Sequence, residues 1–336
     1  MTSTTTSATT TTTMRAVVQD GYGAADVLRH TEVPVPRTLR DDAVLVHVHA
    51  AGLDRGTWHL MTGTPYAVRL AMGVRRPRQP ILGLDLAGTV AAVGSAVTRF
   101  AVGDEVYGIG KGTFAEYAVA REGKLATKPA GITFEQAAAI PVSAITALQA
   151  VTDIARVEKG QRVLVTGTSG GVGSYAVQIA VAAGAVVTGV SSAAKADLVR
   201  SLGAQHVLDY AVDDFAATSN RYDVIIDIAG NASLTRLRRA LTPSGTAVLV
   251  GGEGAGRLLG MGRQLRALVV SLFGKQRLTM RVPKESAADL ERLTALVESG
   301  QVTPAVETTY PLAQAATAMQ DLIDGRVRGK VAITIG

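Results

Sequence analysis

The stretch VLVTGTSGGVGSYAVQIA, residues 163–180, joins an apolar strand-like run to a helix-like pattern through a turn dense in glycine. Four positions without side chains let backbone N–H groups approach a pyrophosphate at the positive end of the following helix: Gly167, Gly170, Gly171 and Gly173. The competing interpretation is a tight turn that serves packing alone. The turn follows a strand, opens a helix and begins a βαβ series, so we predict a dinucleotide site.

The segments around this turn predict an α/β fold with one doubly wound parallel sheet, a Rossmann domain. Five strand-like runs alternate with mostly helical crossovers and lie at 162–167, 185–192, 206–210, 223–230 and 245–252. Helical spacing covers 133–155, where Thr133 and Gln136 are candidate capping residues, and returns at 171–183, 194–204 and 232–241.

The two ends of the chain have a different pattern from the middle. From Arg15 to about Lys128, short alternating runs separated by Gly, Pro and Asp predict β-structure. After residue 284 come a helix, a strand, a second helix and a last strand, which we expect to fold with the first part. The predicted domains are a disordered polar tail (1–13), a β-rich domain in two parts (14–132 and 284–336) and an inserted nucleotide domain (133–283).

Composition limits the class of protein. The chain has 336 residues, is 47% hydrophobic and 18% charged, and contains no cysteine, which excludes disulfides and thiolate-bound metals. The net charge of +6 comes from basic residues spread along the chain without interleaved aromatic residues, so we expect no nucleic-acid partner. The apolar runs are too interrupted to span a membrane, and no targeting pattern stands out, so we expect a cytoplasmic protein without membrane insertion.

The end of the second predicted strand favours NADPH over NADH. An NAD site has an acidic residue there for the ribose hydroxyl, whereas this chain has Ser191 and Ser192, then Lys195. Hydroxyls and an ammonium suit a 2′-phosphate, and Tyr210 could add another hydroxyl. Each of these residues alone could equally be an ordinary surface residue. The other candidate cofactor contacts are Thr146, Ser169, Val172, Gly230, Gly251, Gly252 and Lys330.

From Met14 to Gly336 the sequence resembles the medium-chain dehydrogenase/reductase superfamily, in its zinc-free quinone oxidoreductase branch related to ζ-crystallin. The resemblance rests on PILGLDLAGTVAAVG (80–94), GDEVYG (103–108), TFAEYAVA (113–120), AAAIPVSAITALQA (137–150), the glycine turn, SLGAQHVLDY (201–210) and GRVRGKVAIT (325–334). It implies a GroES-like β-barrel domain, an inserted Rossmann domain and NADPH in the cleft. It also implies homodimers formed through the Rossmann sheets, with residues 277–283 as the edge strand.

The zinc-dependent relatives' ligands are missing. Their glycine-His-Glu stretch reads Gly83-Leu84-Asp85 here, and their cysteine ligands are absent. His47 and His49 share one face of a strand with His59 nearby, so a histidine–carboxylate site is conceivable, but solvated histidines are the commoner case and we expect no metal. Without a Lewis acid, hydride addition suits a quinone or an α,β-unsaturated carbonyl, whose negative charge is delocalised.

Three residues are candidate catalytic residues: Asp54, Tyr66 and Thr146. Asp54 stands where relatives carry Asn in a VNxxD-like stretch, and either donates a proton or caps backbone N–H groups. Tyr66 and Thr146 match positions that line the pocket and contact the nicotinamide in relatives; their alternatives are a loop anchor and a helix-packing residue. The alternatives to a quinone or enone reductase are a zinc-independent alcohol dehydrogenase or aldehyde reductase, working through Asp54 or Thr57, and a non-catalytic NADPH-binding protein.

Overall fold

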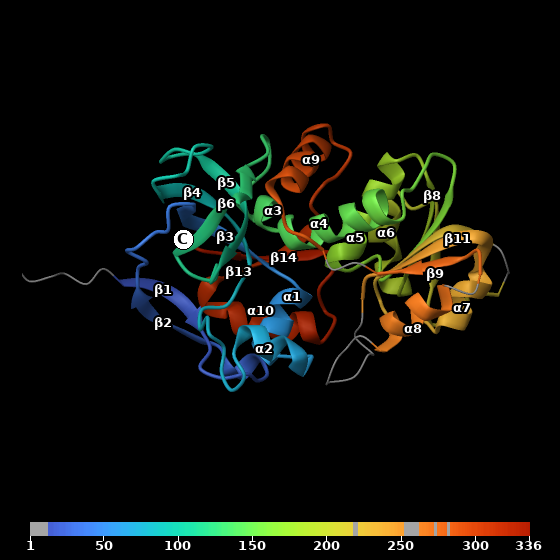
Figure 1. The fold of residues 1–336 in the computed structure, drawn as a ribbon, viewed down its shortest axis with the longest axis horizontal. Coiled ribbons are helices and arrows are strands. Elements are labelled where there is room, and N and C mark those ends of the chain that lie inside the picture. Colours follow the sequence, from blue (N-terminus) through green and yellow to red (C-terminus); the bar gives the residue numbers. More distant parts are fainter. Residues whose placement is uncertain (1–12, 218–220, 252–261, 272–273, 281–282) are drawn as a thin grey trace, which may run out of the picture.

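The computed structural model describes residues 13–217, 221–251, 262–271, 274–280 and 283–336. Two halves lie side by side (Figure 1): one holds mostly antiparallel strands from both ends of the chain, and the other holds the parallel sheet from its middle. This is the α/β fold with a Rossmann sheet inserted into a GroES-like domain that the sequence predicts.

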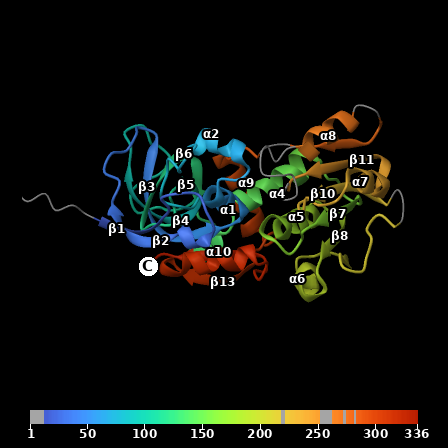
Figure 2. The ribbon, with the colours of Figure 1, turned by 90° about the horizontal axis from the view of Figure 1, so that it is seen from below.

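The parallel sheet has the strand order β12-β11-β10-β7-β8-β9, and every neighbouring pair in it is parallel. The order reverses beside β7, the strand that precedes the glycine turn, so the turn lies at the switch point where such sheets bind ligands. Helices cover both faces (Figure 2), with α5 and α6 on one and α8 on the other. The strands are β7 (Arg162–Thr166), β8 (Val186–Ser191), β9 (His206–Asp209), β10 (Tyr222–Asp227), β11 (Leu241–Leu249) and β12 (Arg277–Thr279).

The helices and turns of this half follow the predicted alternation closely. The long helix after the glycine turn begins one residue beyond Gly170. The edge strand predicted over 277–283 forms as β12, and residues 281 and 282 lie outside the described residues. The helical elements are α5 (Gly171–Ala182), η4 (Ala193–Lys195), α6 (Ala196–Ser201), α7 (Leu234–Ala240) and α8 (Gly262–Ser271).

The second sheet has the order β13-β14-β3-β4-β5-β6, and an additional β3–β6 pairing curves it toward a barrel. The strand β14, near the C-terminus, runs antiparallel to β3, with Val331 opposite Leu53. The last segment of the chain therefore completes the sheet that the first segment starts, as predicted. The strands are β3 (Ala43–Leu53), β4 (Asp85–Val93), β5 (Glu105–Lys111), β6 (Tyr117–Thr127), β13 (Val306–Pro311) and β14 (Lys330–Thr334).

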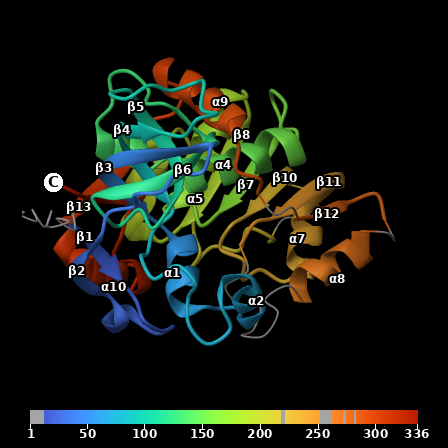
Figure 3. The ribbon, with the colours of Figure 1, turned by 60° about the vertical axis from the view of Figure 1, so that its left-hand side comes forward.

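Shorter elements surround this sheet. The strands β1 (Thr13–Val18) and β2 (Arg29–Pro34) form a separate antiparallel pair. Figure 3 shows α1 and α2 next to each other where the two halves meet. The helical elements are η1 (Ala25–Val27), α1 (Arg55–Thr62), η2 (Tyr66–Val68), α2 (Arg69–Met72), α9 (Ala287–Glu298), η5 (Leu312–Gln314) and α10 (Ala315–Ile323).

The helix predicted over 133–155 is broken into three pieces: α3 (Phe134–Ala138), α4 (Pro141–Leu148) and a π-helical turn, η3 (Gln149–Ile154). Pro141 lacks the N–H that would continue α3, and its fixed φ suits the first turn of a new helix, where it lies. The start is as predicted, because Thr133 and Gln136 form a reciprocal capping box.

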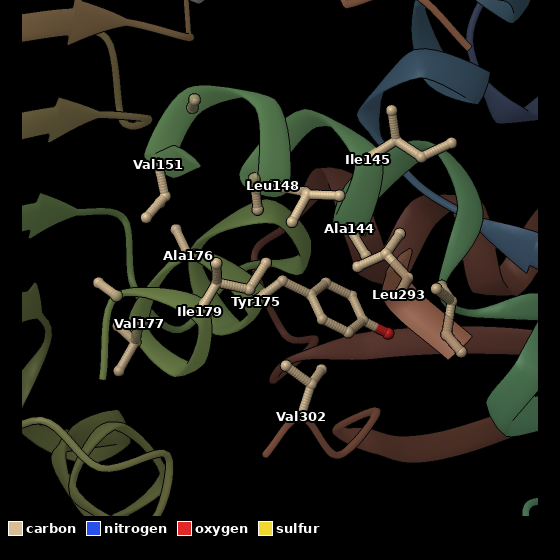
Figure 4. Packing of buried hydrophobic residues seen from close by; sticks show 14 of the residues in the cluster. Ala144, Ile145, Leu148, Val151, Tyr175, Ala176, Val177, Ile179, Leu293 and Val302 are labelled. Atoms are coloured by element: carbon tan, nitrogen blue, oxygen red, sulfur yellow. The ribbon is translucent and has the colours of Figure 1, made fainter. Parts of the chain in front are cut away.

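One hydrophobic cluster joins the two halves. It contains Tyr107 of the barrel, Leu148 of α4, Tyr175 of α5 and Leu293 of α9 (Figure 4 shows the last three). The buried hydroxyls are satisfied, since Tyr175 donates to the Ala139 carbonyl at 3.1 Å and Tyr107 to the Leu290 carbonyl at 2.7 Å. The core therefore contains residues from both sides of the predicted domain boundaries at 132/133 and 283/284. The boundaries themselves stay predictions.

Replacing Leu293 by alanine tests how much this shared cluster stabilises the fold. Leu293 is fully buried, so Leu293→Ala should lower the free energy of unfolding by about 2–5 kcal/mol. Leu70→Ala is the matched control, because Leu70 is 75% exposed and its loss should change the value by less than about 0.5 kcal/mol. Urea unfolding measures both. Equal effects of the two substitutions would contradict the shared core.

Candidate functional site

The glycine turn closes tightly and leaves one side open. Gly167 has φ +69°, a conformation that favours glycine, and a Cβ on Gly173 would lie 2.1 Å from the Gly167 carbonyl oxygen. Gly170 is the N-cap of α5 in an extended conformation, and a Cβ there would meet only the Gly167 oxygen, at 3.4 Å. The packing of the chain therefore explains why Gly167 and Gly173 are glycines, but it does not explain Gly170. The space beside Gly170 is where a phosphate on the helix N-terminus would lie.

A cavity of about 350 Å³ extends from this turn across the ends of β7, β8 and β9. It brings together Gly167 and Ser169 of the turn, Ser191 at the end of β8 and Tyr210 after β9, four of the predicted cofactor residues. The other lining residues are Thr166, Val190, Leu208, Asp213, Phe215, Ala229, Asn231, Ala232 and Arg236. The volume and the mixed polar and apolar lining suit part of a nucleotide.

The charged groups around the cavity differ from the predicted set. The Lys195 ammonium donates to the carbonyls of Gly325 and Val327, at 2.9 and 2.7 Å, instead of lining the cavity. Burial lowers the pKa of Lys195, and the neighbouring Arg328 lowers it further. Arg236 lines the cavity while it pairs with Asp214 at 2.6 Å. The role of Lys195 at the 2′-phosphate stays a prediction.

The remaining predicted cofactor residues lie around the same turn. Val172, in the first turn of α5, packs against the shared core, and Ser192 follows β8. Gly230 has φ +70°, and a Cβ on Gly251 would lie 1.8 Å from the Ile228 carbonyl oxygen, so both glycines are needed by the fold itself. Gly252 lies outside the described residues.

Tyr66 and Thr146 both contact neighbouring groups of the chain. Tyr66 is 41% exposed, and the Arg69 guanidinium lies over its ring, 4.6 Å from the centroid. The Thr146 hydroxyl donates to the Val142 carbonyl within α4 at 2.7 Å. Thr146 also lines a small cavity of about 40 Å³ beside Gln149 and Val250. Their roles toward substrate and nicotinamide stay predictions.

Asp54 lies in a buried cluster of charged groups between the two halves. One carboxylate oxygen, Oδ1, accepts from the Thr57 N–H at 2.8 Å and from the Thr57 hydroxyl at 3.1 Å, which makes Asp54 the N-cap of α1. The other oxygen, Oδ2, lies 3.9 Å from the Lys330 ammonium. Lys330 is 1% exposed, and its ammonium donates to the Ser143 hydroxyl at 3.0 Å.

Asp85 completes this cluster and was not predicted to do so. It is fully buried at the start of β4, with Oδ1 accepting from the Val142 N–H at 3.0 Å and Oδ2 3.8 Å from the Lys330 ammonium. Burial raises the pKa of Asp85 well above its ordinary value, the Asp54 charge adds to the rise, and Lys330 and the Val142 N–H oppose it. The only sequence signal was its place after Gly83-Leu84, in the stretch where zinc-dependent relatives carry a ligand.

Lys330 connects this cluster to the glycine turn. A Cβ on Gly171 would lie 2.9 Å from Cδ of Lys330, so the lysine stem lies against the first turn of α5. Gly329, the residue before it, donates its N–H to the Ser169 carbonyl at 2.8 Å. The predicted cofactor residue Lys330 therefore lies beside the turn, with its ammonium directed into the buried cluster.

The histidines considered as metal ligands have other partners. His47 and His49 lie edge to face with centroids 4.9 Å apart, and His49 also contacts Phe134 and the Thr89 hydroxyl. Burial lowers the pKa of His49, and the neighbouring His47 lowers it further. Within the described parts of the chain, no group of three or more His, Cys, Asp or Glu side chains is arranged to hold a metal ion.

Among the described residues, no helix is long and apolar enough to cross a membrane.

Comparison with known proteins adds a family to this geometry. The family "Alcohol dehydrogenase GroES-like domain" matches residues 40–130, and "Zinc-binding dehydrogenase" matches residues 202–333. The chain is 33% identical over 335 residues to the chloroplast envelope quinone oxidoreductase homolog of Arabidopsis thaliana, covering 95% of this chain and 98% of that one. It is 31% identical over 328 residues to human quinone oxidoreductase, covering 93% and 94%.

Solved structures agree with the sequence relatives. The quinone oxidoreductase from Coxiella burnetii superposes with a TM-score of 0.84 at 28% identity, covering 97% of this chain and all of that one. A quinone oxidoreductase from Pseudomonas syringae pv. Tomato DC3000 gives 0.82 at 26% identity, covering 96% and 100%. Together with the glycine turn at the switch point of a parallel sheet, these matches identify the chain as an NAD(P)H-binding oxidoreductase. It belongs to the medium-chain dehydrogenase/reductase superfamily, in its zinc-free quinone oxidoreductase branch.

Proposed function

We propose that the protein transfers hydride from NADPH to a quinone or an α,β-unsaturated carbonyl without a metal. The observation that carries the proposal is the open turn at Gly170 with its adjoining cavity, which offers N–H groups for a pyrophosphate and hydroxyls further along. Quinone oxidoreductases among the relatives support the acceptor class.

The preference for NADPH rests on what lies at the end of β8. Ser191 and Tyr210 line the cavity there. The first acidic residue after β8 is Asp197, and its carboxylate pairs with Arg200 at 2.9 Å. The carboxylate of Asp213, which also lines the cavity, accepts from the Asp209 N–H at 2.8 Å. A 2′-phosphate would therefore meet hydroxyls at β8, and Lys195 would have to exchange its two carbonyl partners for the phosphate.

The cofactor, when bound, supplies the hydride, and the chain's own residues have to position the acceptor and handle a proton. A quinone or enone receives the hydride on carbon, and its negative charge spreads to oxygen, so a few hydrogen bonds suffice to stabilise it. An enolate then needs one proton. In our proposal Asp54 supplies it from the junction of the two halves, because Oδ1 holds the α1 cap while Oδ2 has no hydrogen-bond partner.

Assembly is part of the proposal. The strand β12 lies at the edge of the parallel sheet and pairs only on its β11 side within the described residues. An unpaired edge can pair with a second copy. We propose a homodimer that joins the two Rossmann sheets through β12.

Lys195→Ala tests the cofactor preference. One charged contact to a phosphate is worth about 1.5–3 kcal/mol, so we expect the KM for NADPH to rise at least about tenfold and the KM for NADH to change little. Steady-state kinetics with both cofactors measure this. Arg200→Ala is the control, because Arg200 is a nearby cation with its own partner, Asp197. Equal effects of Lys195→Ala on both cofactors would contradict the assignment.

Asp54→Asn separates proton donation from helix capping. Asparagine can still accept from the Thr57 N–H, so the cap and the melting temperature should persist, while enone turnover falls at least about tenfold and quinone turnover falls less. A hydroquinone anion can take its proton from water, which explains the difference. Asp54→Ala should instead cost about 1 kcal/mol of stability. Unchanged turnover of both substrates in Asp54→Asn would remove Asp54 from the catalytic residues.

A further inference from the structure

The cluster of Asp54, Asp85 and Lys330 has more buried anions than cations. All three side chains are at most 8% exposed, and two ionised carboxylates around one ammonium would leave one negative charge uncompensated. An unpaired buried charge is costly, and such groups usually take up or lose a proton instead. The helix N-termini of α1 and α4 offset part of this charge through the N–H groups of Thr57 and Val142.

Hydrogen bonding gives an independent reason. Asp54 Oδ2 and Asp85 Oδ2 are both buried without a hydrogen-bond partner, although the Lys330 ammonium lies within 4 Å of each. The ammonium has three protons, of which Ser143 receives one. A buried, ionised carboxylate oxygen without a donor is destabilising, and protonation of Asp85 removes the negative charge from that oxygen.

We propose that this cluster holds one extra proton on Asp85 at neutral pH, and that Lys330 passes it to Asp54 when the substrate is protonated. The catalytic part of this inference rests on the proposed function; the stored proton does not. Asp85 and Lys330 are positioning residues here, since they act through Asp54.

The step balances in protons and electrons. After hydride addition to the enone, Lys330 gives a proton to the ionised Asp54 at Oδ2 and takes one from Asp85 Oδ2, so the ammonium is regenerated. Asp54 then gives this proton to the enolate, forming the new C–H or O–H bond. Asp85 is left ionised, and a proton from water restores it after product release. The hydride from NADPH and this proton together reduce the enone by two electrons.

Two other titratable groups, Glu285 and Tyr175, interact electrostatically with Asp85. Glu285 disfavours its ionised form, and Tyr175 is neutral because burial raises the pKa of its phenol well above the ordinary value. Glu285 itself pairs with Lys124 at 2.5 Å. None of these groups supplies the missing positive charge, so the proton stays the simplest compensation.

The sign of the pH dependence follows from a pKa of Asp85 that is raised in the folded protein. The unfolded chain releases this proton above about pH 4, whereas the native cluster keeps it. The contribution of this proton to the free energy of unfolding is fully present below about pH 4 and is lost as the pH rises toward the pKa of Asp85 in the folded protein. Asp85→Asn carries no such loss, so its melting temperature relative to wild type should increase steadily as the pH rises above about 4.

The direct experiment is infrared difference spectroscopy of the full chain at pH 7, which detects the carbonyl stretch of a protonated carboxyl. We expect this band in wild type, its loss in Asp85→Asn and its retention in Asp227→Asn. Asp227 is the matched control because it is equally buried but pairs one to one with Arg263. A band that is absent from wild type, or that persists in Asp85→Asn, overturns the stored proton.

Kinetics test the transfer separately. In Asp85→Asn the ratio of enone to quinone turnover should fall at least about fivefold and lose its pH dependence. An unchanged ratio with the infrared band present would refute the relay alone. If wild type reduces neither substrate, the proposed function fails while the infrared result still decides the proton.

Discussion

A Cβ atom on Gly173 would lie 2.1 Å from the Gly167 carbonyl oxygen and 2.7 Å from Cα of Thr168, so α5 can start this close to β7 only with glycine at position 173. This close approach fixes where the N-terminus of α5 lies relative to the strand ends of the parallel sheet. The strand order reverses beside β7, so the same point is the switch point of the sheet. The cavity, with Ser191 at the end of β8 and Tyr210 after β9 in its lining, extends from this point.

The barrel half reaches this turn through the last strand of the chain. Gly329 bonds to Ser169, and Lys330 extends past Gly171 into the buried cluster with Asp54 and Asp85. Asp54 of this cluster is the N-cap of α1, and Asp85 accepts from the Val142 N–H at the N-terminus of α4. The cofactor turn and the candidate proton donor are therefore held by one set of contacts, drawn from segments near residues 54, 85, 143, 171 and 330.

Much of the fold could be predicted from the sequence because its signals are local. Alternating and helical periodicity gave the strands and crossovers, and glycines with a strand before them and a helix after them gave the turn. The break at Pro141 also has a local cause, yet the long apolar pattern around it concealed the break. The π-helical turn at 149–154 has no sequence signature that we can identify.

The candidate site was harder to predict because its contacts are distant in sequence. Lys330 and Ser143 are 187 positions apart, and neither residue alone indicates the pairing. Lys195 follows β8 as a phosphate-binding lysine would, but its ammonium is held by carbonyls near residue 326, which periodicity cannot reveal. Arg236 is not among the residues predicted for the site, and only the fold brings it to the cavity. Sequence patterns identify elements well, whereas the partners of a long side chain depend on tertiary packing.

The central claim is that the glycine turn is kept open for a dinucleotide phosphate. Gly170 tests it most directly, because its extended backbone and open surroundings should accept valine without disturbing the fold. The measurement is a fluorescence titration of NADPH against wild type and Gly170→Val, with thermal unfolding of both. We predict an unchanged melting temperature and NADPH binding weakened at least about tenfold, since the new side chain would occupy the phosphate position. Equal NADPH affinity in the two proteins would contradict the claim.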